Sequence, residues 1–165
     1  MPDIDYRIVG LDPDPFRPLF ELDDETLARR GAVRRVVSEA NVTPCRVSLE
    51  DAEPGEEVLL LRFAHLEAAS PYAASGPIFV RRAATRRFVA TNAIPDMLRR
   101  RLLSVRAYDA SHFMLESDVV EGAVLDGAIR RLFENPDVDY LHVHNARPGC
   151  FDCRVERAGD PPNGA

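Results

Sequence analysis

The residues best suited to chemistry lie near the carboxyl end of the chain, where two histidines and two cysteines stand close together. His142 and His144 alternate with Val143, and Cys150 and Cys153 follow across a short turn. Histidine and thiolate are zinc ligands, and they are also the components of nucleophilic catalysis. This segment therefore has the residue types for a metal site or an activated thiol, and the directions of its side chains decide between them.

The spacing of the two cysteines argues against a structural zinc site. A metal-binding Cys-Xaa-Xaa-Cys pair lies on a tight turn, whereas Cys153 belongs to an alternating sequence over residues 151–155 that predicts a strand. Residues three apart in a strand face opposite sides of the sheet. We therefore expect Cys153 to be a buried hydrophobe and Cys150 to lie on the polar side.

Burial of one face of a hairpin determines which side chains share each side, because a slip by one residue would move every apolar side chain into water. On this rule the apolar face holds Leu141, Val143, Phe151, Cys153 and Val155. The opposite face, called here the polar face, carries Tyr140, His142, His144, Cys150, Asp152 and Arg154. So many hydrogen-bonding groups require water or a ligand as partners.

Several functions are open to the polar face. The candidate catalytic residues are His142, His144, Cys150 and Asp152, with Cys150 as nucleophile and Asp152 orienting a histidine base. As an alternative, the two histidines and Asp152 offer a metal-dependent enzyme two nitrogens and one oxygen. A solvated face without chemistry is a further reading. The sequence does not decide whether the protein is an enzyme, and it indicates no cofactor.

Arginines favour a fourth function, a pocket for a small ligand with a carboxylate or phosphate group. Arg106 alternates with apolar neighbours and is expected to face away from the core, as are Arg46 and Arg154. Guanidinium groups bind such anions through paired hydrogen bonds. A loop of small residues at 70–77 could admit a ligand to its backbone amides. The expected ligand-binding residues are Arg46, Arg106, Tyr140, Arg154, Tyr72, Ser75 and Gly76.

A second group of arginines forms a patch over residues 81–101, where seven arginines stand against Asp96 alone. Residues 1–25 carry eight acids and two arginines. The two segments could complement each other within the fold or between the subunits of a homo-oligomer, and the patch could bind another protein. Nucleic-acid binding is not favoured, because Phe88 is the only aromatic residue in the patch and the sequence has no recognisable nucleic-acid-binding motif.

The composition limits the class of protein. The chain has 165 residues, a formal net charge of -6 and 21 basic residues, all arginine. The absence of lysine excludes Schiff-base chemistry and phosphate loops of the Gly-Lys-Ser/Thr type. We expect no membrane span and no signal peptide, because no long apolar run occurs. Three cysteines, an odd number, favour the reducing cytoplasm over a disulfide-bonded secreted protein.

The elements that position these residues predict an α+β fold, with a mostly antiparallel sheet of several hairpins and two or three helices packed on it. Alternating or apolar segments predict strands at residues 4–8, 33–38, 45–49, 58–65, 78–80, 104–108, 113–116, 140–144 and 151–155. Helical spacing and capping residues predict helices at 25–30, 95–102 and 124–133. We expect one globular domain over residues 1–158 and a disordered tail over 159–165.

Four segments carry a family resemblance. They are Gly10-Leu11-Asp12-Pro13, Pro44-Cys45-Arg46-Val47-Ser48-Leu49 before a Pro54-Gly55-Glu56 turn, Ser75-Gly76-Pro77-Ile78-Phe79-Val80-Arg81, and His142-Val143-His144-Asn145-Ala146-Arg147-Pro148-Gly149-Cys150. In order and spacing, the region from Tyr6 to Arg157 resembles the bacterial family catalogued as "domain of unknown function 1203". The resemblance implies a bacterial domain without an assigned reaction, so no catalytic role comes with it.

Overall fold

The computed structural model describes residues 3–159, which form two antiparallel sheets and a few short helices, an α+β fold as predicted. The larger sheet has six strands in the order β5-β1-β9-β8-β6-β7. Its strands are β1 (Tyr6–Val9), β5 (Val89–Thr91), β6 (Leu102–Tyr108), β7 (Met114–Glu121), β8 (Tyr140–Asn145) and β9 (Phe151–Arg157). Every pairing in it is antiparallel. Hairpins connect β6 to β7 and β8 to β9, and the other three pairs bring together strands that are not consecutive in the chain.

The smaller sheet has the order β2-β3-β4. Its strands are β2 (Ala32–Val36), β3 (Glu57–Leu66) and β4 (Ala74–Arg81). Strand β3 is central, as its long apolar sequence predicted, and its side chains Val58, Leu59, Leu61 and Leu66 are buried. The expected strand at residues 45–49 is instead a turn that touches β4 through a single bridge between Cys45 and Phe79.

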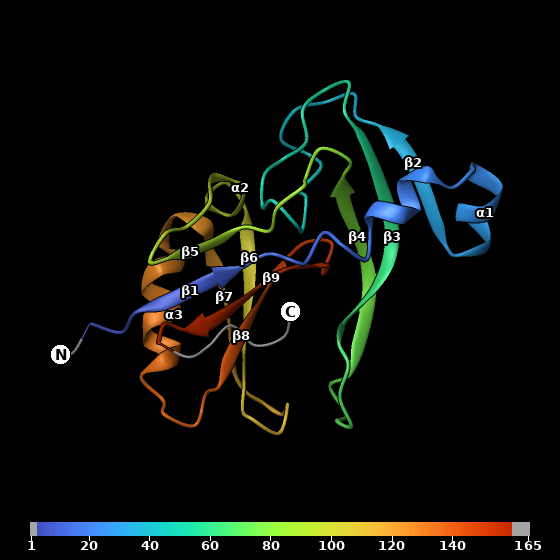
Figure 1. The fold of residues 1–165 in the computed structure, drawn as a ribbon. Helices are drawn as coiled ribbons and strands as arrows, with labels where there is room; N and C mark the ends of the chain where they lie inside the picture. The colour runs from blue at the N-terminus through green and yellow to red at the C-terminus, as the bar shows by residue number, and fades with distance from the viewer. Residues whose placement is uncertain (1–2, 160–165) are drawn as a thin grey trace.

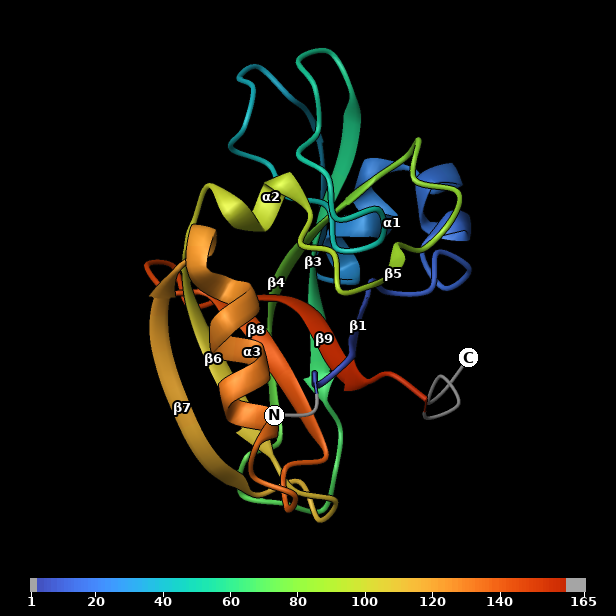
Figure 2. The same ribbon diagram turned by 90° about the vertical axis from the view of Figure 1, so that its left-hand side faces the viewer.

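The helices lie on the outer sides of the two sheets, so that the order of layers is helix, large sheet, small sheet, helix (Figure 1). Helix α3 (Leu125–Phe133) covers one face of the large sheet (Figure 2). Its buried stripe of Leu125, Ile129, Leu132 and Phe133 packs against the inward residues of β6, β8 and β9. The other helical segments are η1 (Arg17–Glu21), α1 (Asp24–Arg29), α2 (Asp96–Arg99) and η2 (Gly122–Val124).

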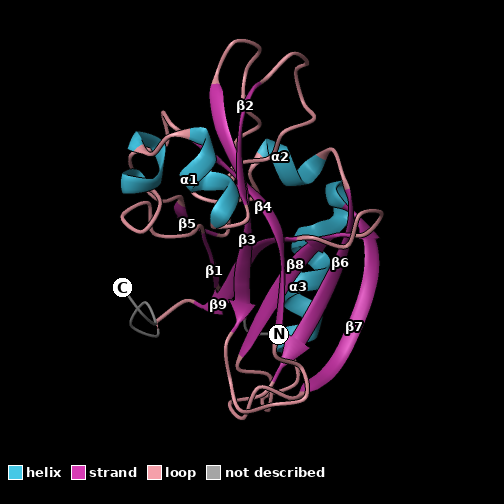
Figure 3. Ribbon diagram, turned by 90° about the vertical axis from the view of Figure 1, so that its right-hand side faces the viewer, coloured by secondary structure: helices cyan, strands magenta, loops and turns pink. Residues whose placement is uncertain are grey.

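A second core lies between the small sheet and the segment that precedes it. Phe16, which precedes η1, packs with Phe20 of η1 and Leu27 of α1 on the small sheet. Their partners there are Leu59 of β3 and Ile78 of β4. Figure 3 shows α1 beside the small sheet, on the side opposite the large sheet's helix α3. The two sheets therefore have separate apolar cores, and the polar face of the large sheet lies between them. No helix among residues 3–159 is long and apolar enough to cross a membrane.

The expected tail begins at residue 159, and residues 160–165 lie outside the described part of the chain. Strand β1, which corresponds to the strand predicted at residues 4–8, lies between β5 and β9. The short strand β5 was not predicted, because three residues give too little alternation to distinguish a strand from a loop.

Candidate functional site

The polar face of the large sheet is covered by the small sheet rather than by water. His142 is 3% exposed and His144 is 1% exposed, because His65 of β3 lies over them. The His65 ring stacks on Phe151 at 5.3 Å and meets the His144 ring edge-on at 4.9 Å. We call His65, His142 and His144 the histidine cluster. The expectation that water or a ligand covers this face is therefore wrong for its centre.

The environment of the histidine cluster keeps its imidazoles neutral. Burial, together with the positive charge of Arg106, lowers the pKa of His144 to about 4, although the hydrogen bond to the carbonyl oxygen of Gly149 opposes the shift. Burial and the neighbouring His144 lower the pKa of His142 well below its usual value. Burial also lowers the pKa of His65, and the positive charge of Arg106 adds to this effect. At neutral pH these rings are not proton donors of the imidazolium type, which disfavours that catalytic role.

Two ring nitrogens of the cluster have no hydrogen-bond partner among residues 3–159, namely Nδ1 of His142 and Nε2 of His144. The Nδ1 atom of His144 lies 3.0 Å from the carbonyl oxygen of Gly149, which makes it the protonated nitrogen and leaves Nε2 as an acceptor. Such unsatisfied groups are rare inside proteins.

Arg106 does lie beside the cluster, because β6 neighbours β8 and pairs Arg106 with His142. Arg154 pairs with His142 from the other side, on β9. Arg154, however, donates to Glu156 at 3.0 Å and stacks over the ring of Tyr140 at 3.9 Å. Arg106 donates from Nε to the hydroxyl oxygen of Ser104 at 3.3 Å, and it has no carboxylate partner within the described chain. Of these two arginines, Arg106 is therefore the one available to an anion.

Tyr140 has a structural environment. Its hydroxyl oxygen lies 2.9 Å from Nδ1 of His112, and its ring stacks on Tyr108 at 5.2 Å. Burial raises the pKa of its hydroxyl to about 12. The Tyr140 side chain is thus packed and hydrogen-bonded within the protein, which leaves it little capacity to bind a ligand.

A β-bulge between β8 and β9 overturns two of the predicted side-chain directions. His144 pairs with Phe151 and Val143 with Cys153, so Asp152 is an extra residue on β9. Phe151 consequently lies against the histidine cluster rather than in the apolar core. Asp152 is displaced from the histidines and accepts a hydrogen bond from Asn145 Nδ2 at 3.0 Å.

The separation of Asp152 from the histidines also affects the alternative of a metal-dependent enzyme. Across the described residues, no group of three or more His, Cys, Asp or Glu side chains is placed to hold one metal ion. The predicted set of His142, His144 and Asp152 is therefore not assembled, and Asp152 cannot orient either histidine as a triad member would.

Asp152 forms a buried ion pair with Arg46, which reaches β9 from the turn at residues 44–49. The Arg46 side chain is 1% exposed, while its neighbours Cys45 and Val47 lie in the apolar core on the small sheet, as predicted. Its Nε lies 3.5 Å from Oδ1 of Asp152 and donates to the carbonyl oxygen of Phe151 at 2.7 Å. A second nitrogen donates to the carbonyl oxygen of Pro44. A buried guanidinium needs this many partners, because desolvation of the charge is costly.

The remaining nitrogen of Arg46, Nη2, lies 3.1 Å from the sulfur of Cys150. Asn145 Nδ2 lies 3.6 Å from the same sulfur. Cys150 thus contacts two hydrogen-bond donors, neither of them a histidine. Burial raises the pKa of Asp152 to about 6 in spite of the opposing charge of Arg46. The four residues Arg46, Asn145, Cys150 and Asp152 form what we call the Arg46 cluster.

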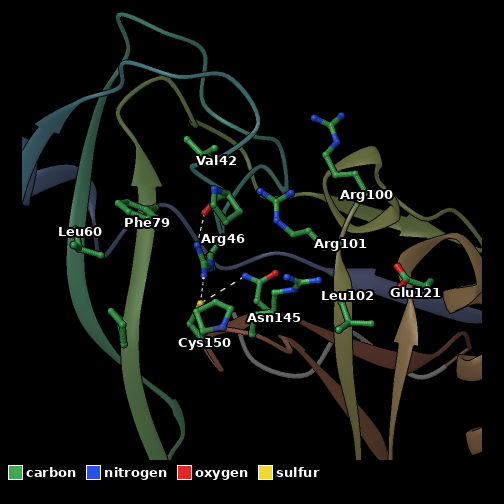
Figure 4. A pocket seen from close by; sticks show the side chains of 14 residues that line it. Val42, Arg46, Leu60, Phe79, Arg100, Arg101, Leu102, Glu121, Asn145 and Cys150 are labelled. Atoms are coloured by element: carbon green, nitrogen blue, oxygen red, sulfur yellow. Dashed lines mark hydrogen bonds between the residues drawn. The ribbon is translucent and has the colours of Figure 1, made fainter.

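A pocket of about 680 Å³ opens beside the Arg46 cluster, between the two sheets (Figure 4). Apolar and proline side chains form its walls, and its polar groups are mostly arginines. The lining residues are Val42, Pro44, Arg46, Leu60, Pro77, Phe79, Arg100, Arg101, Leu102, Glu121, Asn145, Arg147, Pro148 and Cys150. The structure therefore brings together Arg46 and Cys150 of the predicted site, and places Arg106 and the histidines elsewhere.

Three arginines and one asparagine that line the pocket were not predicted as site residues. Asn145 and Arg147 directly follow the histidines in the sequence, and their place in a turn between two strands was the available signal. Arg100 and Arg101 were assigned only to the arginine patch. His65, which covers the polar face, ends a predicted strand in alternation with Phe63, but its packing on β8 depends on the arrangement of the sheets.

The loop expected at residues 70–77 is only partly a loop. Ser75 and Gly76 belong to β4, where they pair with Ala64 and Phe63 of β3. Ser75 accepts a hydrogen bond from Arg62, and the Tyr72 ring contacts Tyr108 and Phe113. Ser75 and Gly76 border a hollow of about 400 Å³ on the small sheet, distinct from the pocket beside Arg46. Tyr72, Ser75 and Gly76 are therefore not part of the pocket beside Arg46.

The arginine patch at residues 81–101 is largely paired within the chain. Arg81 contacts Glu50 and Glu56, and Arg82 contacts Glu21 of the acidic amino-terminal segment. Arg101 contacts Asp51 at 2.6 Å. Of these pairs, only Arg82–Glu21 is exposed at both side chains, and such pairs have small energies. Together the pairs leave fewer free charges for a partner than the sequence suggested.

Comparison with curated proteins and with solved structures gives no match for this chain. A family model described as "Protein of unknown function (DUF1203)" matches residues 42–157. The match includes the turn that carries Arg46, the strands of the histidine cluster and every lining residue of the pocket. Because the match spans most of the sequence, the chain belongs to the DUF1203 family.

Proposed function

We propose that the protein binds a small molecule with a carboxylate or phosphate group in the pocket beside the Arg46 cluster. The observation that carries the proposal is the lining of this pocket, where four arginines stand against a single acidic side chain, Glu121. Small-molecule sites are concave and mostly apolar, with a few polar groups that set the orientation of the ligand. A pocket of about 680 Å³ is in the size range of such sites.

The four arginines differ in their capacity to bind an anion. Arg46 is paired with Asp152, and both Arg100 and Arg101 share Asp51. Arg147 is exposed and, within residues 3–159, has no carboxylate partner. We therefore assign Arg147 as the primary contact of the anionic group. Arg100 and Arg101, which also line the pocket, add positive potential.

The other lining groups restrict the ligand further. Asn145 is 5% exposed and its Oδ1 has no hydrogen-bond partner in the described chain, so it would accept a hydrogen bond from the ligand. Val42, Leu60 and Phe79 provide an apolar wall. The best ligand therefore combines an anionic group, a hydroxyl or N–H donor, and an apolar part.

A thermal-shift screen of phosphates, nucleotides and organic acids, with phenyl phosphate as a reference compound, tests the proposal. A ligand at 100 times its dissociation constant stabilises a protein by about 2.7 kcal/mol, which raises the melting temperature measurably. We expect anions to stabilise the protein and neutral analogues not to do so. Arg147→Ala should remove the effect. Arg86→Ala is the matched control, since Arg86 is also exposed, lacks a carboxylate partner among the described residues and lies outside the pocket.

Two results would contradict the proposal: no anion raises the melting temperature, or Arg147→Ala responds as Arg86→Ala does. A second location for an anion is the histidine cluster beside Arg106. The unpartnered nitrogens of His142 and His144 are the observation in its favour. Binding there predicts the reverse pattern, in which Arg106→Ala removes the stabilisation and Arg147→Ala retains it.

A further inference from the structure

We propose that Cys150 undergoes thiol-disulfide exchange with small anionic disulfides, so that the pocket forms a mixed disulfide with an acidic thiol compound. This inference rests on the proposed function, because the same arginines would attract the acidic groups of the disulfide. It adds a covalent reaction and a substrate class to the binding site.

The exposure of the cysteines singles out Cys150. Cys45 and Cys153 are both 0% exposed and lie in the two apolar cores. Cys150 is partly exposed, has a free thiol and lines the pocket. A small disulfide can therefore reach the sulfur of Cys150, whereas the other two sulfurs are covered by packed side chains.

The contacts of the Cys150 sulfur suit a nucleophile. The thiolate is the reactive form of cysteine, and hydrogen-bond donors and cations near the sulfur favour it. Arg46 Nη2 at 3.1 Å supplies a positive charge, and Asn145 Nδ2 at 3.6 Å supplies a second N–H donor. Arg46 is held in this position by its contacts to Phe151, Pro44 and Asp152. The donors are thus fixed before any reactant arrives.

Asn145 provides an independent indication that this end of the pocket receives a ligand. Its side chain lines the pocket, its exposed fraction is 5%, and its Oδ1 lacks a hydrogen-bond partner in the described part of the chain. Figure 4 shows the Asn145 amide between Cys150 and Arg101. Because Asn145 donates its Nδ2 hydrogens to Asp152 and Cys150, the oxygen is left to accept from a ligand N–H or O–H.

The exchange reaction balances without any further reactant. The Cys150 sulfur attacks one sulfur of the disulfide RSSR, a new S–S bond forms, and the original S–S bond breaks. The leaving thiolate takes up the proton that Cys150 gives up, so the products are the mixed disulfide and RSH. The Cys150 sulfur is oxidised and the leaving sulfur is reduced.

The substrate class follows from the groups around Cys150. Arg147, Arg100 and Arg101 lie around the opening and favour carboxylates on the disulfide. Asn145 Oδ1 favours an amide N–H near the reacting sulfur. A disulfide of a small acidic peptide has both groups, and we use glutathione disulfide as its probe.

The experiment measures adduct formation by intact-protein mass spectrometry with three disulfides at equal concentration. Glutathione disulfide is anionic, bis(2-hydroxyethyl) disulfide is neutral and cystamine is cationic, and each rate is divided by the rate with a free cysteine peptide. We expect a normalised rate for glutathione disulfide about ten-fold above the neutral disulfide, the low end of electrostatic attraction effects. Cystamine should be slowest. Cys150→Ser should abolish the adduct.

Charge variants separate attraction from simple exposure of the thiol. Arg147→Ala should slow the glutathione reaction about five-fold, as expected for the loss of one exposed charge contact, and leave the neutral reaction unchanged. Arg86→Ala should change neither rate. The inference is overturned if the adduct forms on Cys45 or Cys153, if no adduct forms, or if the neutral disulfide reacts as fast as the anionic one.

The failure of this inference can be distinguished from the failure of the proposed function. Cys150→Ser lacks the thiol but keeps the arginines, so phenyl phosphate should still raise its melting temperature if the pocket binds anions. Stabilisation of Cys150→Ser without any adduct on the wild-type protein overturns the exchange reaction alone. Loss of both effects overturns both proposals.

Discussion

At the scale of single residues, the Arg46 cluster and the histidine cluster use burial in different ways. Arg46 and Asp152 are buried as charges and compensate each other, with additional hydrogen bonds to Phe151 and Pro44. The histidines are buried as neutral groups, and their pKa values are lowered first by burial and to a smaller extent by the positive charge of Arg106. The first arrangement holds polar groups at a pocket, and the second packs two sheets together.

The histidine cluster predicts a pH dependence of stability. In the unfolded chain His144 has its ordinary pKa of 6.5, whereas burial lowers the pKa in the folded protein to about 4. Between these values the unfolded chain binds a proton that the folded protein does not, so stability falls as the pH falls from 6.5 to 4. The shift corresponds to about 3 kcal/mol for His144. Asp152 acts in the opposite direction, because burial raises its pKa to about 6.

The variant His144→Asn isolates this contribution, since asparagine can keep the hydrogen bond to Gly149 but does not titrate. Urea unfolding at a series of pH values should show a smaller loss of stability between pH 6.5 and pH 4 in His144→Asn than in the wild-type protein. Parallel curves for the two proteins would contradict the assignment of a buried neutral imidazole.

At the scale of elements, the hairpin of β8 and β9 shows what alternation can and cannot predict. Alternation correctly predicted both strands and the burial of Leu141, Val143, Cys153 and Val155 in one core. It failed at Phe151, because the rule assumes a regular ladder and the bulge at Asp152 adds a residue to one strand only. No residue type marks this bulge, so the sequence assigned Phe151 and Asp152 to the wrong faces.

Helix α3 supports the large sheet, and its apolar stripe was evident from one-turn spacing. Ile129 and Leu132 are 0% exposed and pack in the main core. Ile129→Ala should therefore reduce the free energy of unfolding by about 2 to 5 kcal/mol, through lost burial and the cavity left behind. Arg131→Ala is the control on the outer side of the helix, where two exposed ion pairs predict a loss below about 1 kcal/mol each. Equal losses in denaturant titrations of the two variants would contradict the packing of α3 described above.

At the scale of the whole molecule, the relation between the two sheets creates the pocket. The sequence predicted the hairpins β6-β7 and β8-β9, since each depends on local alternation and turn residues, but it could not predict that the small sheet covers the polar face. That arrangement depends on contacts far apart in the sequence, such as those of His65 with Phe151 and of Arg46 with Asp152. For the same reason the sequence identified Arg46 and Cys150 as site residues but did not predict that the two side chains are in contact.

Gly10 joins the two halves of the molecule. It follows β1, and the turn that carries Arg46 passes so closely that a Cβ atom on Gly10 would lie 2.2 Å from the Val47 carbonyl oxygen. The neighbouring Leu11 donates its backbone N–H to the carbonyl oxygen of Arg46 at 2.8 Å. This close approach requires glycine, because a methyl group would push the turn away from β1.

Gly10→Ala should therefore lower the melting temperature and displace Arg46 from Cys150. We expect a destabilisation of about 1 to 3 kcal/mol from overpacking. Gly127→Ala is the matched control, since a Cβ at Gly127 meets no heavy atom within 4 Å and alanine favours the helix. An unchanged melting temperature in Gly10→Ala would show that the turn is not held where the structure places it.

The most direct test of the central claim is an NMR titration of the labelled protein with phenyl phosphate, observing the Nε–Hε signal of Arg147 and the side-chain amide of Asn145. Binding in the pocket predicts that both signals shift in a saturable manner, together with backbone amides of residues 146–150, while the signals of His65 and Arg106 remain in place. Saturable shifts at His65 and Arg106 with no change at Arg147 and Asn145 would place the anion at the histidine cluster and contradict the account.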